Sequence, residues 1–221
     1  MSDAPYNRLA GEVAISVAAA ATRPLREACE RLALLVDALE RFVTTSSGPA
    51  PYPYKSLQVL RNDLTDAYLQ ASAAARTLVD LEAALAADRE AGTLDVRREV
   101  ELGLSLAEHH VSVATELLVD VIDVPQARGA RGVLALVVAQ LVAWCAASAR
   151  QQTGSTLTVR VTASANRILV TVADNGAGFE TLPDFLRTLP AALGVQPRDV
   201  LASVALGQGC VFELYFDAVA P

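Results

Sequence analysis

Apolar side chains recur at threes, fours and sevens along two long segments in the first half of the chain. The first set is Val13, Val17, Ala21, Ala28, Leu32, Leu35 and Leu39, and the second is Leu57, Leu60, Leu64, Ala67, Ala71, Ala74, Leu78, Leu81 and Leu85. This period places each set on one face of a helix about 45 Å long. One hairpin of two such helices cannot bury both stripes, so a second hairpin is needed. The pattern therefore predicts a homodimer held by a four-helix bundle.

The residues around the stripes indicate where these helices end. Residues 44–54 are rich in Thr, Ser, Gly and Pro, a composition that favours a loop between the two helices. Ser56 is a good N-cap for the second helix. We expect this helix to continue to Arg89, before Gly92 and Thr93 close it.

After residue 92 the pattern changes to short helices and strands. Helical patterns cover residues 95–108 and 133–150, strand patterns cover 156–163, 167–173 and 210–216, a strand-like portion lies within 111–123, and residues 125–132 form a loop. The first two strand patterns alternate Leu, Val and Thr around an Ala-Asn turn, which predicts a hairpin. The predicted fold class is α+β, with residues 1–92 as a helical hairpin and residues 93–221 as an α/β sandwich.

Composition excludes several classes of partner. The chain has 221 residues and a net charge of −7, and the clustered Lys and Arg that nucleic acids or anionic membranes require are missing. The nearly apolar run at residues 133–147 is shorter than the roughly 20 residues of a membrane span. Asp3 argues against a signal peptide, and three widely spaced Cys indicate reduced thiols. We therefore expect a cytoplasmic protein with no nucleic-acid or membrane partner.

Residues 170–179 carry the sharpest local motif. They read Val-Thr-Val-Ala-Asp-Asn-Gly-Ala-Gly-Phe, so a strand pattern delivers Asp174 into a turn. Gly176 and Gly178 would let the backbone approach a ligand closely. An Asp-x-Gly-x-Gly motif is also typical of an ordinary turn after a strand, so its meaning depends on what surrounds it.

A helix with Gln140, Leu141, Val142 and Trp144 precedes this motif, and the predicted hairpin joins the two. With this order of elements, most of the chain resembles the sensor histidine kinases of two-component systems and their GHKL-type ATPase domain. The resemblance implies that Asp174 contacts the adenine amino group. It also implies that Gly176 and Gly178 are contacts of an adenine nucleotide, ATP or ADP.

The other motifs of that family are altered. The helix motif Asn-Leu-Leu-x-Asn-Ala aligns with residues 140–145, and its magnesium ligand becomes Trp144, whose indole has one N–H donor and no oxygen. Pro24-Leu25 matches the Pro-Leu that follows the phosphoacceptor His, which places Ala19 at the acceptor position. No Gly-x-Gly-Leu-Gly phosphate turn follows the Asp motif. The resemblance thus implies a pseudokinase with no catalytic residue, no metal site and no expected cofactor.

Two further expectations concern single side chains. We expect the Trp144 ring to pack against the strand of Val170 and Val172 and to leave too little room for ATP, with Asp174 kept as a residue that caps backbone N–H groups of its turn. His109 and His110 are interpreted as solvated residues at a helix end, where cations suit the helix dipole. A displaced phosphoacceptor or a pH switch is the alternative for these two histidines.

Three functions fit these observations. The first is a catalytically inactive histidine-kinase-like protein, a dimeric interaction or regulatory module in a bacterial two-component pathway, whose partner is a response regulator or another signalling protein. The second is a regulator that binds adenine nucleotides without kinase chemistry. The third is a histidine-phosphotransferase-like protein, which would need a helical His that the first stripe lacks. The altered motifs favour the first.

Overall fold

The computed structural model describes residues 54–86, 92–111, 115–182 and 184–219, together with residues 7, 10–15, 17–18, 21, 26–32 and 34. The chain divides into two compact units, one of residues 1–15 and 80–221 and one of residues 16–79. The domain boundary after residue 92 stays a prediction. Ala19, Pro24, Leu35 and Leu39 lie outside the described residues, so the phosphoacceptor position and the end of the first stripe have no structural account.

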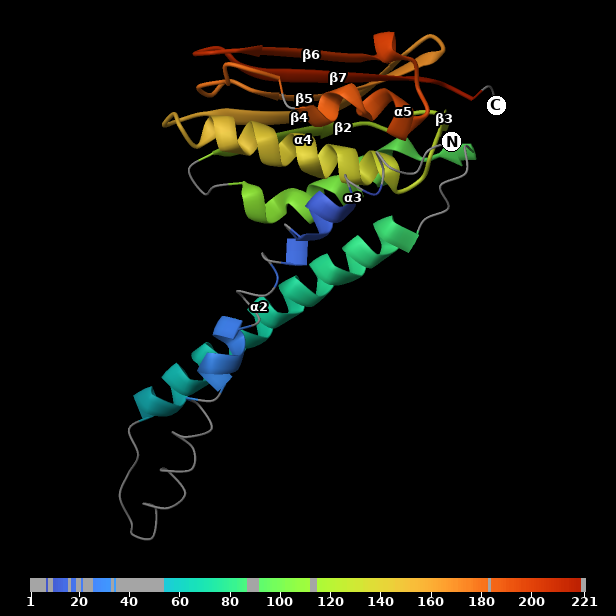
Figure 1. Ribbon diagram of the computed structural model, residues 1–221. Helices are drawn as coiled ribbons and strands as arrows, with labels where there is room; N and C mark the ends of the chain where they lie inside the picture. The colour runs from blue at the N-terminus through green and yellow to red at the C-terminus, as the bar shows by residue number, and fades with distance from the viewer. Residues whose placement is uncertain are drawn as a thin grey trace, which may run out of the picture. The chain divides into compact units, whose positions relative to one another are not determined.

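The long helix α2, Tyr54–Ala86, forms where the second stripe predicts a helix (Figure 1). It begins two residues before Ser56, so Ser56 is not the N-cap that we expected. Ala67, Ala74 and Leu81 of the stripe are buried, whereas Leu64 and Leu78 are exposed. In the first stripe the described residues are helical, and Val13, Val17, Ala21 and Ala28 are buried.

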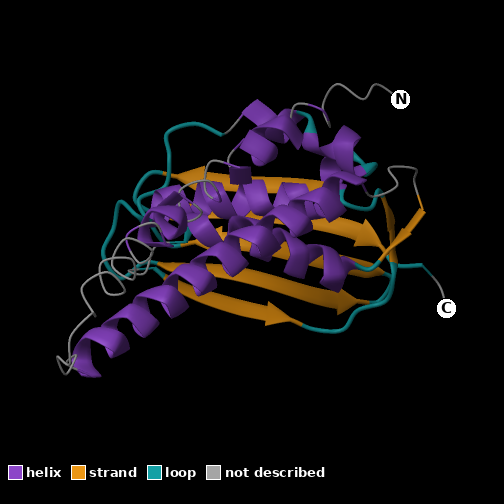
Figure 2. Cartoon of the chain, turned by 90° about the horizontal axis from the view of Figure 1, so that it is seen from below, coloured by secondary structure: helices purple, strands orange, loops and turns teal. Residues whose placement is uncertain are grey.

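The larger unit is built on a five-stranded sheet with the order β2-β4-β5-β7-β6. Its strands are β2 Glu116–Val121, β4 Thr156–Ser164, β5 Arg167–Asp174, β6 Val200–Ala205 and β7 Gly209–Asp217. The pair β2–β4 is parallel and the other neighbouring pairs are antiparallel. The helices α3, Val96–Ala107, and α4, Val133–Ala149, lie on one face of this sheet (Figures 1 and 2). The mixed α+β character of this unit is confirmed.

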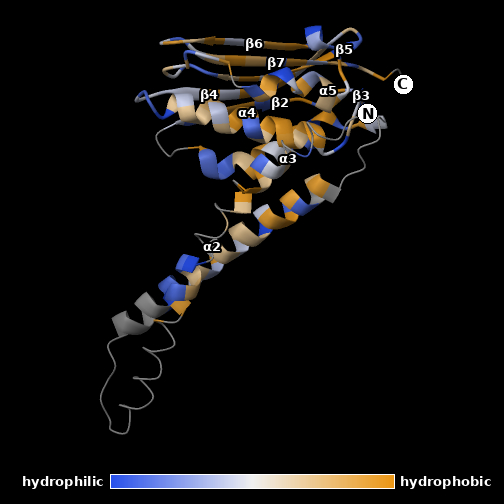
Figure 3. Ribbon diagram, viewed as in Figure 1, coloured by the Kyte–Doolittle hydropathy of each residue, from blue (hydrophilic) through white to orange (hydrophobic). Residues whose placement is uncertain are grey.

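Buried and less buried residues alternate along β4 and β5, two inner strands of the sheet. Every second residue of β5 is buried, from Ile168 to Asp174, and Leu157, Val159 and Val161 of β4 are fully buried. The predicted hairpin is confirmed, and Ala165 takes a positive φ of 53° in its turn. The helix α4 fills the space under these strands because most of its residues are apolar (Figure 3).

Several short elements were not predicted. Gly92–Leu94 forms β1 and pairs with β3, Ala127–Gly129, although we expected a helix end and a loop there. The strand β6, the helix α5, and three short 3-10 helices were also missed. These are α5 Leu189–Leu193, η1 Glu108–His110, η2 Asp184–Arg187 and η3 Pro197–Asp199. None of the helices in the described parts of the chain could cross a membrane.

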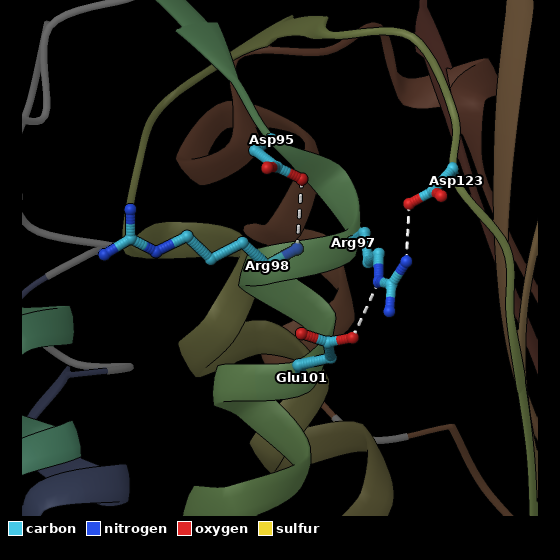
Figure 4. Close-up of polar contacts among 5 residues, drawn as sticks. All are labelled: Asp95, Arg97, Arg98, Glu101 and Asp123. Atoms are coloured by element: carbon cyan, nitrogen blue, oxygen red, sulfur yellow. Dashed lines mark hydrogen bonds and ion pairs between the residues drawn. The ribbon is translucent and has the colours of Figure 1, made fainter.

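The start of α3 is defined by side chains that Figure 4 shows. Asp95 is the N-cap and accepts a hydrogen bond from the backbone N–H of Arg98, 3.1 Å away. The Arg97 guanidinium donates to Glu101 one turn later and to Asp123, just after β2. These groups are exposed, so their main effect is to hold α3 beside the end of β2 rather than to add much stability.

A buried carboxylate caps α4 in place of a residue of its own. The N-cap Gly132 has no side chain, and Glu99 of α3 instead accepts hydrogen bonds from the N–H groups of Gly132 (2.8 Å) and Ala135 (3.3 Å). Burial raises the pKa of Glu99 above its ordinary value, and the two backbone donors oppose this rise. Glu99 therefore joins the two helices at a cost in desolvation.

We predict that Glu99→Ala lowers the free energy of unfolding by about 1–3 kcal/mol, because two buried N–H groups lose their acceptor. Glu99→Gln keeps an acceptor oxygen and removes the charge. A raised pKa in the folded protein means that its stabilising effect is complete at low pH and is lost as pH rises through the folded value. Wild type should thus lose stability relative to Glu99→Gln as pH rises above 4.5. Urea unfolding of the three proteins between pH 4 and 8 measures this, and parallel pH curves for wild type and Glu99→Gln would contradict it.

Candidate functional site

The candidate site is centred on the carboxylate of Asp174, the last residue of β5. This residue is 6% exposed. Its Oδ1 accepts hydrogen bonds from Ser148 Oγ (2.7 Å) and the Gly176 N–H (2.8 Å), and its Oδ2 accepts one from the Cys210 N–H (3.1 Å). The carboxylate thus joins α4, the turn after β5 and the start of β7. Asp174 caps a backbone N–H of its own turn, as we expected, and it also holds two other elements.

Two buried thiols adjoin this carboxylate. Burial is the main cause that raises the pKa of Cys145 well above its ordinary value, and the charge of Asp174 adds to the rise. Burial and the same charge raise the pKa of Cys210 to about 12. The raised pKa values favour the protonated thiols at neutral pH, which are poor nucleophiles. The described cysteines are free thiols.

Ser148 is a residue of the site that sequence reasoning missed. Its hydroxyl donates to Asp174 and accepts from the Gly178 N–H (2.8 Å), and its carbonyl accepts from the Ala177 N–H (3.3 Å). One side chain of α4 thereby holds both ends of the Asp174 turn. One signal could have found it, because Ser148 is the single polar residue among the buried residues of α4.

The glycines of the motif lie against protein backbone. A Cβ at Gly176 would stand 2.6 Å from the Ser148 carbonyl oxygen. Gly178 has a φ of +68°, and a Cβ there would collide with the carbonyl oxygen of Ala205 at the end of β6. The Gly207 N–H also donates to the Ala177 carbonyl, 2.6 Å away. The close approach that we expected to serve a ligand is used here by α4 and by the β6–β7 turn.

Trp144 lies beside this turn with two other aromatic rings. Its ring centroid is 4.2 Å from that of Phe179 and 6.5 Å from that of Phe185. We expected the ring against the strand of Val170 and Val172. That contact stays a prediction, and the ring contacts that the structure shows are those with Phe179 and Phe185. Trp144 belongs to the partly exposed side of α4, while residues such as Leu141 and Cys145 are buried. That side of α4 also carries Gln140, Ala143 and Ala147.

The two histidines lie in the short 3-10 helix that follows α3. His109 and His110 lie in η1, with their ring centroids 4.0 Å apart. Burial lowers the pKa of both, that of His110 to about 4, which favours the neutral form of each ring. A lowered pKa opposes the charged form that we expected to interact with the helix dipole, whereas His109 is exposed, as we expected of a solvated residue. The carbonyl of His110 accepts a hydrogen bond from Arg150, 2.7 Å away.

In the described part of the chain, the side chains that most often bind metal ions are dispersed. No group of three or more His, Cys, Asp or Glu side chains comes together there. Trp144, the position that the resemblance assigns to the magnesium ligand, faces two phenylalanine rings. The indole at this position has no oxygen, the ligand atom that a hard cation takes.

The architecture is an α+β sandwich that is similar in structure to many histidine kinase catalytic domains. One is the histidine kinase domain of a blue-light activated histidine kinase from Erythrobacter litoralis, with a TM-score of 0.49, 14% identity and coverage of 90% of this chain and 94% of that one. The Acinetobacter baumannii histidine kinase AdeS gives 0.46 and 15%, and covers 86% and 96%. A mycobacterial sensor histidine kinase, MprB, gives 0.46 and 14%, and covers 58% and 97%. No family model and no curated protein matches the sequence.

Proposed function

We propose that the chain is a catalytically inactive, histidine-kinase-like signalling protein. It acts as a dimeric interaction or regulatory module in a bacterial two-component pathway in the cytoplasm. The observation that carries this proposal concerns the carboxylate of Asp174. It already accepts hydrogen bonds from three protein groups, on Ser148, Gly176 and Cys210. The sequence resemblance assigns the same carboxylate to adenine.

An adenine amino group needs a carboxylate lone pair that is both free and accessible. At Asp174 both oxygens already have protein donors, and the side chain is buried. A carboxylate has about four lone-pair sites, and three of them accept these protein donors, so an adenine amino group would have to reach the remaining site of a side chain that is only 6% exposed. This supports a structural role for Asp174, in which Gly176 and Gly178 allow the surrounding backbone to close around it.

The aromatic cluster of Trp144, Phe179 and Phe185 supports the absence of kinase chemistry. Transfer of a phosphoryl group relies on a metal ion and on cationic or N–H groups around the phosphates. The cluster presents aromatic carbon and one indole N–H beside the turn instead. A negatively charged triphosphate with its magnesium ion would be poorly stabilised there.

The surface of α2 supports the dimer. Buried Ala67 and Ala74 mark the side of the helix that is already packed, and Leu64, Tyr68 and Leu78 are exposed on the adjoining side. At 100° per residue these three side chains fall within one arc of about 80°. A contiguous exposed apolar face of this kind is typical of a protein interface. A second copy would cover it, and a response regulator or another signalling protein is the proposed partner of the dimer.

The proposal is tested by titrating the protein with ATP and ADP, with and without magnesium, by calorimetry and thermal unfolding. A ligand at 100 times its Kd would add about 2.7 kcal/mol of stability. We expect no heat of binding and no shift in Tm, and no labelled protein after incubation with radioactive ATP. Light scattering of the same samples should give two chain masses. Saturable stabilisation by ATP that ADP competes away would replace the proposal with a nucleotide-binding regulator, and a monomer would contradict the dimer.

A further inference from the structure

The edge strand β2 differs from the rest of the sheet in its exposure. It pairs with β4 on one side, and none of the strands in the described ranges pairs with its other side. Its first five residues are exposed, and Leu117, Leu118, Val119 and the following Ile122 are each between 38% and 50% exposed. We call residues 116–122 the β2 edge. A strand edge leaves a row of backbone N–H and C=O groups that a further strand can use.

One side of the β2 edge continues the hydrophobic core. Residues that are paired across neighbouring strands point to the same face of a sheet. The pairs are Leu117 with Leu157, Val119 with Val159 and Val121 with Val161. The three β4 partners are fully buried under the helices, but Leu117 and Val119 are exposed. The helix layer therefore covers β4 and stops short of β2, which leaves an apolar row uncovered.

The opposite side of the β2 edge is mixed and acidic. It carries Glu116, Leu118, Asp120 and Ile122 in alternation. Asp120 forms an ion pair with Arg160 of the neighbouring β4, 3.1 Å away, whereas Glu116 forms no salt bridge with any residue that the structure describes. The chain as a whole carries a net charge of −7. This side therefore favours a positively charged neighbour.

The β2 edge has acidic charges at Glu116 and Asp120 but lacks the other common protections against strand addition. Edge strands are commonly blunted by Lys, Pro or a bulge. The sequence of β2, Glu-Leu-Leu-Val-Asp-Val, contains neither residue, and its six residues pair with β4 in unbroken register. The contacts of Arg97 with Glu101 and Asp123 hold the segment after β2 beside α3 (Figure 4). The β2 edge can therefore pair with a further strand along its whole length, and the contact of Arg97 with Asp123 fixes the segment that follows it beside α3.

We propose that the β2 edge binds an extended segment of a partner protein as a sixth strand of the sheet. This segment has apolar side chains on the helix side and Lys or Arg on the other side. Backbone hydrogen bonds would add the strand, Leu117 and Val119 would contact its apolar row, and Glu116 would face its basic row. The inference is independent of nucleotide binding and of the helical dimer, because it uses neither the Asp174 turn nor α2.

A second copy of this chain fits the β2 edge less well. In an antiparallel pair that keeps both helix layers on one side, Leu118 opposite Leu118 would place Glu116 opposite Asp120 of the other copy. Like charges directly opposite each other are destabilising. A shift by two residues relieves this contact but places Asp120 opposite Leu118. A basic strand gives opposite charges at these positions.

The test uses a fluorescent seven-residue peptide of alternating Lys and Val, with fluorescence anisotropy as the readout. A peptide of the same composition in blocked order, Lys-Lys-Lys-Lys-Val-Val-Val, controls for attraction by the net charge alone. Leu118→Lys places a cation on the β2 edge, and Leu201→Lys is the matched control, because Leu201 is 48% exposed on β6, the other edge strand of the sheet. Thermal unfolding confirms that both variants are folded.

We expect the alternating peptide to bind at least about tenfold more tightly than the blocked one. The blocked peptide cannot place all its Val on one side of the strand and all its Lys on the other, and a tenfold loss corresponds to about 1.4 kcal/mol. Leu118→Lys should weaken this binding by about tenfold, and Leu201→Lys should leave it unchanged. Slowed hydrogen exchange in residues 116–121 would locate the peptide. Equal binding of both peptides, equal effects of both variants, or a concentration-dependent dimer that only Leu118→Lys dissociates would overturn the proposal.

Discussion

Asp174→Ala is expected to lower the free energy of unfolding of the sheet unit by about 3 kcal/mol or more, because each buried donor left without an acceptor costs about 1–3 kcal/mol. Three such donors, on Ser148, Gly176 and Cys210, share this carboxylate. Its loss would also release the contacts between α4, the turn after β5 and the start of β7. Urea unfolding followed by circular dichroism measures the change.

The matched control for this prediction is Asp184→Ala. Asp184 is an exposed aspartate that begins η2 in the segment after the same turn. We expect it to change stability by less than about 0.5 kcal/mol, as is usual for surface positions. If Asp174→Ala unfolds at the same urea concentration as Asp184→Ala, the carboxylate has no structural role. A role of this carboxylate in binding a ligand would then explain its burial better.

The second large effect is expected for Gly178→Ala. The φ of Gly178 is +68°, where a side chain costs about 1–2 kcal/mol, and its Cβ would also collide with the Ala205 carbonyl oxygen. We expect a loss of at least about 3 kcal/mol, or no folded protein, since the colliding atom is backbone and cannot rotate away. Expression in soluble form and thermal unfolding provide the measurement.

Gly207→Ala distinguishes the cost of a left-handed backbone from the cost of a Cβ that collides with a neighbouring atom. Gly207 has a similar φ of +76°, but a Cβ there has no atom within 4 Å. This variant should lose only the roughly 1–2 kcal/mol of the left-handed backbone. Equal destabilisation by the two substitutions would mean that the turn can move away from β6. Such a movement would open the space around Asp174 and favour the nucleotide-binding regulator.

Local patterns predicted the elements whose neighbours are close in sequence. The β4–β5 hairpin was predicted because Leu and Val alternate on both sides of Ala165 and Asn166, and the structure pairs these residues in register. The start of α3 was predicted at Asp95, whose side chain caps a backbone N–H three residues later. The burial of α4 was predicted from an apolar run with one amide. In each case the sequence pattern lies within one helix, one helix start or one hairpin.

The elements that were missed depend on partners far away in the chain. The strand β1 forms because Gly92–Leu94 meets Ala127–Gly129, and neither segment has a strand pattern of its own. Glu99 was not singled out as a cap, because the helix that it caps begins more than 30 residues later, at Val133. Such pairings have no local period and become visible only when the chain is folded.

The candidate site also combines features that the sequence predicts with contacts that only the folded structure shows. The sequence alone placed an aspartate after a strand and glycines where a close approach is needed, and both features are present, because strand alternation and the absence of a Cβ are properties of the residues themselves. Which groups make that approach was decided by packing. Ser148 and Cys210 reach Asp174 from elements that are distant in sequence, and Trp144 of α4 contacts Phe179 and Phe185, which follow β5. Hydrogen-bond partners of a buried carboxylate depend on where three separate elements meet, and no pattern within one segment contains that information.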